Sequence, residues 1–132
     1  MPALTQLIGF VSVTDPARAR AFYGEVLGFR LLDEDDYALV FDAHGSMVRA
    51  GKAKTFTPAQ GTVMGWEVED IRAAVKELAG RGVKFEQWGL PFMKQDEDGV
   101  WLPGNGDAVA WFKDPEGNVL SISQHAKRPA RG

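Results

Sequence analysis

The 132-residue sequence contains no cysteine. This absence excludes disulfide bonds, thiolate metal sites and cysteine nucleophiles, and it is typical of proteins in a reducing compartment. An excess of positive charge is also lacking, because 15 Lys and Arg residues oppose 18 Asp and Glu residues, for a formal net charge of −3. We therefore expect no binding to nucleic acid or to an acidic membrane surface.

Long apolar runs are absent as well. No stretch approaches the length of a membrane span, and the first ten residues lack the basic region and long apolar run of a signal peptide. We therefore expect a soluble, cytoplasmic protein. The hydrophobic share of 45% and the charged share of 25% are ordinary for a globular protein, and the length suits one domain.

The same order of structural signals occurs twice along the chain. Residues 10–33 and residues 65–87 each show a strand pattern, an aspartate, an amphipathic helix, a glycine and a further strand. The two aspartates, Asp15 and Asp70, are suited to begin the helices, and the glycines are suited to end them. Apolar and β-branched runs predict strands at residues 5–13, 29–33, 37–42, 46–51, 62–68, 83–88, 107–113 and 118–124.

This order predicts an α+β fold made of two βαβββ modules in tandem. The modules span about 4–53 and 62–125, with a linker at about 54–61, in a single domain over residues 1–125. One helix covers one face of a four-stranded sheet, so two modules can cup their open faces around a shared cavity, as a barrel-like pair of mixed sheets. We expect residues 126–132 to form a frayed tail.

Two motifs carry a resemblance to a known family: "GFVSVTDPARARAFYGEVLGF" at residues 9–29 and "AWFKDPEGN" at residues 110–118. With the repeated module, they make residues 4–125 resemble the vicinal oxygen chelate superfamily. Its members include glyoxalase I, extradiol dioxygenases, methylmalonyl-CoA epimerase, and the fosfomycin and bleomycin resistance proteins. The resemblance implies the cupped fold and a homodimer.

Enzymes of this superfamily hold one divalent metal with His, Gln or Glu side chains from four strands. The resemblance places three of these positions at Ile8, Val63 and Ser121, and Arg49 is the best candidate for the fourth. A transition metal needs about three or four donors, most of them imidazole or carboxylate. These residues offer essentially none, so we expect no metal and no other cofactor. A displaced metal site formed by Gln6, Glu67 and His125 is an alternative.

The sequence is rich in tryptophan, with four in 132 residues. An aromatic wall with a few polar groups is typical of a pocket for a flat or apolar small molecule. Trp101 and Trp111 suit either such a pocket or the core. The candidate ligand-binding residues of the cavity are Ile8, Phe10, Arg49, Val63, Glu67, Phe92, Trp101, Val109, Trp111, Ser121 and Ser123.

These observations favour a metal-free protein that binds a small aromatic or apolar molecule, as the antibiotic-resistance members do. One alternative is an enzyme: either a metal-dependent lyase, isomerase or dioxygenase of glyoxalase type with displaced ligands, or a metal-independent enzyme that uses Arg49, Glu67 or Ser121. Another is an interaction domain whose cavity is filled by its own side chains. No catalytic residue is assigned, and the cavity could lie within one chain or between two.

Overall fold

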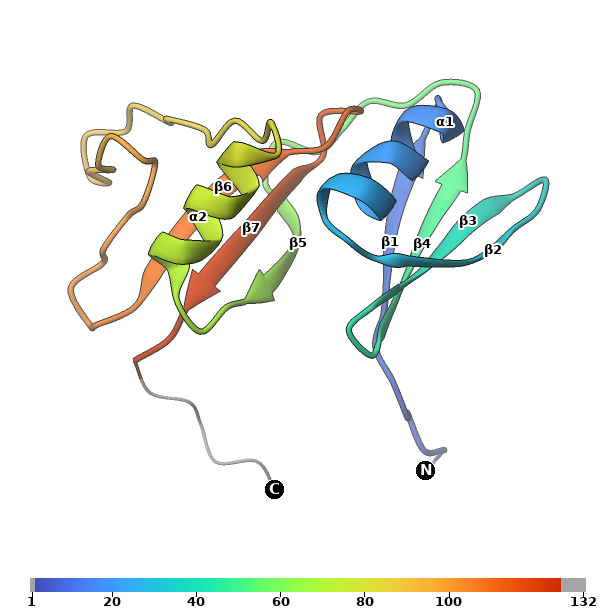
Figure 1. The fold of residues 1–132 in the computed structure, drawn as a ribbon, viewed down its shortest axis with the longest axis horizontal. Coiled ribbons are helices and arrows are strands. Elements are labelled where there is room, and N and C mark those ends of the chain that lie inside the picture. Colours follow the sequence, from blue (N-terminus) through green and yellow to red (C-terminus); the bar gives the residue numbers. More distant parts are fainter. Residues whose placement is uncertain (1, 127–132) are drawn as a thin grey trace. The chain divides into compact units, whose positions relative to one another are not determined.

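The computed structural model describes residues 2–126, which form two compact units. The first unit comprises residues 2–60 and 114–118, and the second comprises residues 61–113 and 119–126. Each unit is a mixed sheet with a helix on one face (Figure 1), which confirms the α+β class. The shared cavity stays a prediction. The expected frayed tail lies outside the described residues, except for Ala126.

The first unit contains a four-stranded sheet. Its strands are β1 (Ile8–Val13), β2 (Arg30–Glu34), β3 (Ala38–Ala43) and β4 (Ser46–Lys52), in the spatial order β1-β4-β3-β2. The strand β1 is parallel to β4, and the other pairs are antiparallel. These bounds agree with the predicted strands to within three residues at each end.

The helix of the first unit begins as predicted and continues differently. Asp15 caps α1 (Pro16–Ala19), because its side chain accepts a hydrogen bond from the Arg18 N–H at 3.2 Å. The chain then widens into a π-helix, η1 (Arg20–Val26), with a bond of 2.9 Å from the Leu27 N–H to the Phe22 carbonyl. The periodicity of the sequence predicts a helix but does not distinguish these two forms.

The helix packs on one face of this sheet, where the apolar core lies. Tyr23 of η1 is fully buried, and its ring centroid lies 5.7 Å from that of Phe41 on β3. Strand alternation places the following buried residues on this covered face: Val11, Val13, Leu39, Phe41, Val48 and Ala50. The opposite face of the sheet carries no helix, and we name it the first open face.

A buried carboxylate fixes the turn at residues 114–118 within the first unit. Asp114 is 5% exposed, and its Oδ2 accepts hydrogen bonds from the Tyr23 hydroxyl at 2.6 Å and from Asn118 Nδ2 at 2.9 Å. Its Oδ1 accepts from the backbone N–H groups of Glu116 and Asn118. Burial and the Asp114 charge raise the pKa of Tyr23, so the phenol keeps its proton and remains a donor.

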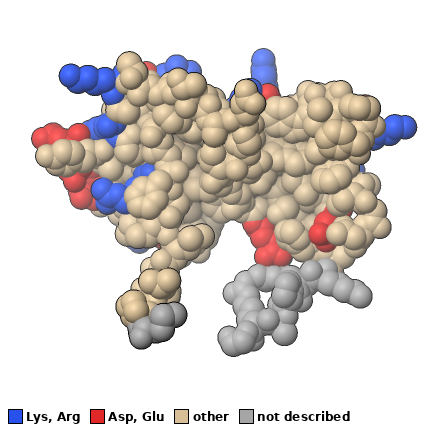
Figure 2. All heavy atoms as spheres, turned by 180° about the vertical axis from the view of Figure 1, so that it is seen from behind, with Lys and Arg blue, Asp and Glu red and all other residues tan. Residues whose placement is uncertain are grey.

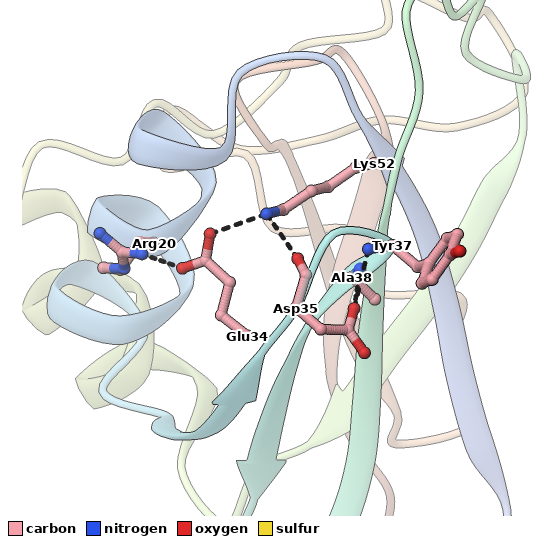
Figure 3. Close-up of polar contacts among 6 residues, drawn as sticks. All are labelled: Arg20, Glu34, Asp35, Tyr37, Ala38 and Lys52. Atoms are coloured by element: carbon pink, nitrogen blue, oxygen red, sulfur yellow. Dashed lines mark hydrogen bonds and ion pairs between the residues drawn. The ribbon is translucent and has the colours of Figure 1, made fainter.

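Polar contacts join η1 to the hairpin end of the same sheet (Figure 3). Glu34 forms ion pairs with Arg20 and with Lys52, and the Lys52 Nζ also donates to the Asp35 carbonyl at 2.7 Å. The Asp35 carboxylate accepts from the N–H groups of Tyr37 and Ala38, and these bonds lower its pKa. The acidic run at residues 33–36 therefore comprises the end of β2 and a structured turn.

The second unit contains a three-stranded sheet. Its elements are β5 (Thr62–Glu67), α2 (Ile71–Gly80), β6 (Ala108–Lys113) and β7 (Val119–Gln124), in the spatial order β5-β7-β6. Asp70 caps α2 by accepting from the Ala73 N–H at 3.1 Å, as predicted. The helix packs on β6 and β7, where Phe112, Leu120 and Ile122 are buried (Figure 1). We name the other face the second open face.

The predicted strand at residues 83–88 is wrong, so the second unit is not a full βαβββ module. Phe85 forms only an isolated antiparallel bridge to Phe112 of β6. A ladder continued from this bridge would place Trp88 opposite Val109. Trp101 takes that place instead, and it exchanges two backbone hydrogen bonds with Val109. The long excursion after residue 88 thus returns to β6 and interrupts the expected fourth strand.

Within residues 2–126, the helices are too short or too polar to cross a bilayer.

Replacing Tyr23 by Phe tests the buried carboxylate. The change removes one hydrogen bond to a charged acceptor without changing the shape of the ring, so we expect the free energy of unfolding to fall by about 2 kcal/mol. The matched control is Tyr37→Phe, because Tyr37 is 78% exposed; its effect should stay within about 0.5 kcal/mol. Urea unfolding measures both, and equal effects of the two changes would contradict the role given to Tyr23.

Candidate functional site

The second open face is defined by two rows of residues across the three strands. One row contains Gly65, Ser121 and Trp111, and the other contains Glu67, Ser123 and Val109. Strand alternation places both rows on the side away from α2. The structure therefore brings together five of the candidates from the sequence: Glu67, Val109, Trp111, Ser121 and Ser123.

Three indole rings gather beside this face, and we name Trp88, Trp101 and Trp111 the tryptophan cluster. The Trp101 and Trp111 rings stack with centroids 6.2 Å apart, and the Trp88 ring meets Trp111 edge-on at 6.3 Å. All three side chains are partly exposed. The Trp111 Nε1 donates to the Thr62 hydroxyl at 3.1 Å, so this indole is held in a fixed orientation while its ring stays accessible.

The excursion that carries Trp88 and Trp101 is held by one side chain. The Gln95 Nε2 donates to the carbonyls of Glu86 and Gly99, at 2.9 and 2.8 Å, and its Oε1 accepts from the Trp88 N–H at 2.8 Å. These bonds join the beginning of the excursion, at residues 86–88, to the part that returns to β6. Phe92, which the sequence also proposed for the site, is 76% exposed and makes no ring contact with the described residues.

The two serines of β7 have different surroundings. A Cβ atom at position 65 would overlap the Ser121 Oγ, so only glycine leaves room for this hydroxyl on the second open face. Ser123 Oγ lies 2.9 Å from His125 Nε2, and His125 Nδ1 lies 3.4 Å from Asp107 Oδ2. Both ring nitrogens of His125 are therefore engaged within the second unit.

Asp107 holds the end of β7 to the loop before β6. Its Oδ1 accepts a hydrogen bond of 3.0 Å from the Ala126 N–H, which, together with the neighbouring His125, lowers the pKa of Asp107. The contacts among Ser123, His125, Asp107 and Ala126 fix this end of β7.

A polar pocket opens at the ends of β5 and β7. It has a volume of about 510 Å³ and is lined by Glu67, Val68, Glu69, Gln124 and His125. The acidic lining differs in chemistry from the tryptophan cluster. Glu67 thus borders this pocket as well as the second open face.

Other ligand-binding candidates from the sequence lie together on the first open face. Phe10, Arg49 and Val40 form one row across β1, β4 and β3, and Ile8 pairs with Met47 in the next row. Phe10 is 66% exposed, and Ile8 is 40% exposed. Val63, the remaining candidate, lies in the second unit at a bulge between Thr62 and Met64.

The side chains at the four expected metal positions do not fit a metal. Ile8 and Val63 have no lone pairs, Arg49 is a cation, and Ser121 offers only a neutral hydroxyl. Within residues 2–126, no three His, Asp or Glu side chains lie close enough together to hold an ion. The displaced set gains no support either, since both nitrogens of His125 are engaged and Gln6 lies outside β1.

One known protein family matches most of the chain. The family model of the Glyoxalase/Bleomycin resistance protein/Dioxygenase superfamily matches residues 5–122. The chain belongs to this superfamily. A comparison with curated proteins finds no match.

Solved structures of the superfamily share the fold of this chain. A bleomycin resistance determinant encoded on the transposon Tn5 is 20% identical, with a TM-score of 0.72, and the match covers 93% of this chain and 99% of that chain. A glyoxalase family protein from Enterococcus faecalis is 19% identical, with a TM-score of 0.66 and coverage of 92% and 96%. At these identities the likeness establishes the fold alone.

Sequence reasoning missed four residues that shape the site: Thr62, Gly65, Trp88 and Gln95. The abundance of tryptophan was a usable signal for Trp88. Nothing in the sequence marks Gln95, because its three partners are backbone groups that meet only after the excursion has folded.

Replacing Gln95 by Ala tests how the tryptophan cluster is positioned. The change removes three hydrogen bonds, each contributing about 1 kcal/mol, so local opening of residues 86–101 should become easier. We expect amide exchange at Trp88 to accelerate by about tenfold or more, while β3 and β4 keep their protection. The control is Gln60→Ala, a change at an exposed site. Unchanged exchange in the Gln95 variant would show that other contacts hold the excursion.

Proposed function

We propose that this chain binds a small aromatic or apolar molecule with residues of its open sheet faces, without a metal. The observation that carries the proposal is the tryptophan cluster. Two of its rings are stacked and the third meets Trp111 edge-on, all three are partly exposed, and the bond to Thr62 fixes the orientation of Trp111. A rigid aromatic surface beside two serine hydroxyls and a carboxylate suits a flat ligand with a few polar groups.

The surface and the superfamily support this proposal. Much of the surface seen in Figure 2 is formed by residues that are neither acidic nor basic. The Tn5 relative is described as a bleomycin resistance determinant, so one protein of this fold confers resistance to an antibiotic. We extend only the general class, a small organic molecule, to this chain.

We also propose that the protein is a cytoplasmic homodimer. Leu4, Leu7 and Phe10 are strongly exposed on the segment that leads into β1 and on β1 itself. Because β1 lies at the edge of its sheet, this apolar segment is suited to pack against a second copy. The absence of cysteine agrees with a reducing compartment.

An enzyme of glyoxalase type with displaced metal ligands is the alternative function. Such an enzyme needs a cluster of imidazole or carboxylate donors. The described residues form no such cluster. A metal-independent enzyme that uses Arg49, Glu67 or Ser121 is a further alternative. The observations therefore favour ligand binding.

The fluorescent dye N-phenyl-1-naphthylamine, a neutral aromatic probe, tests the proposal. We expect wild-type protein to bind the dye, and Trp111→Ala to weaken binding by about tenfold or more, because the ring that contacts both other indoles of the cluster is lost. The control is Trp66→Ala, which removes the same group from the other side of β5, where Trp66 shares a row with the buried Ile122. Absence of dye binding, or equal binding by the two variants, would contradict the proposal.

A further inference from the structure

Arg49 occupies an unusual electrostatic position on the first open face. Its neighbours along β4, Val48 and Ala50, are buried on the covered face, so alternation directs Arg49 to the open side. Its direct partners in the row are the apolar residues Phe10 and Val40, and Asp33 of β2 follows beyond Val40. The guanidinium group is thus attached to a half-buried side chain whose nearest neighbours in the row are apolar.

Three other cations around this sheet have acidic partners, and Arg49 does not. Arg20 and Lys52 pair with Glu34, and Arg30 pairs with Asp42. Among residues 2–126, Arg49 has neither a hydrogen bond nor an ion pair. The charge of Arg49 contributes to the lowered pKa of Asp35, but the Asp35 carboxylate accepts its hydrogen bonds from the backbone of Tyr37 and Ala38.

An unpaired guanidinium group in partly apolar surroundings has a strong preference for one kind of partner. Partial burial weakens its hydration, and its planar array of N–H donors matches the two oxygens of a carboxylate, sulfonate or phosphate group. Phe10 beside it is exposed and can contact the ring of a ligand whose anionic group reaches Arg49. The row therefore offers one cationic contact and one aromatic contact to the same small molecule.

We infer that Arg49 binds an anionic group of the ligand, so that the ligand class is an aromatic or apolar organic anion. This inference rests on the proposed function and narrows it, since a ring contact such as that of Phe10 does not by itself distinguish neutral from charged aromatic compounds.

Two dyes with the same ring system test the inference. The sulfonate 8-anilinonaphthalene-1-sulfonate carries the anionic group, and N-phenyl-1-naphthylamine lacks it. We expect Arg49→Gln to weaken binding of the sulfonate by about tenfold or more, and binding of the neutral dye by less than about twofold. Arg49→Lys should give an intermediate loss for the sulfonate, because the charge remains while the planar donor array is lost.

The control is Arg18→Gln, which removes one positive charge from the exposed side of α1. It should leave the affinity for both dyes within about twofold, since a distant charge acts only weakly through solvent. Equal losses of sulfonate affinity in the Arg49 and Arg18 variants would overturn the role of Arg49, while binding of the neutral dye would still support the proposed function. If wild-type protein bound neither dye, the proposed function and this inference would both fall.

Discussion

Each sheet of this protein has a single helix, and one helix covers only one face. On the covered faces, residues such as Phe41, Phe112 and Leu120 are buried and serve packing. Residues that alternate to the opposite, open face of each sheet do not have that role. The open faces therefore carry the side chains that can meet a ligand, and the period-two alternation of the strands decides which residues these are.

The Asp114 carboxylate secures this arrangement in the first unit. Four donors surround it, and among the described residues no buried side-chain nitrogen or oxygen lacks a hydrogen-bond partner. A buried charge is tolerated only when it is satisfied in this way, so Tyr23 and the turn at residues 114–118 depend on each other. The polar groups of the open faces are less constrained by hydrogen bonds and ion pairs. Ser121 occupies the space left by Gly65, and Arg49 has no acidic partner within residues 2–126.

The chemistry of the open faces differs from that of a metal centre. Indole rings, serine hydroxyls and a guanidinium group dominate, whereas a transition metal requires several imidazole or carboxylate donors. Such side chains recognise a ligand by ring contact and by a small number of hydrogen bonds.

Much of the fold followed from local signals in the sequence. Asp15 and Asp70 cap their helices, and Gly28 and Gly82 adopt the left-handed conformation, with φ of 77° and 97°. Trp111 and Ser121, both named from the sequence as candidates for the cavity, pair in one row of the second open face. The failures concern contacts between distant segments: the pairing of Trp101 with Val109, which displaced the expected strand, and the bonds of Gln95 depend on where the excursion returns. Local periodicity contains no information on that return.

The central claim is that ligand binding by this protein needs no metal. The most direct test is the affinity for N-phenyl-1-naphthylamine before and after exhaustive dialysis against EDTA, and again after addition of Ni²⁺, Zn²⁺ or Mn²⁺. The account predicts the same affinity in all of these conditions. Loss of affinity on dialysis, with recovery on addition of one of the metals, would contradict it.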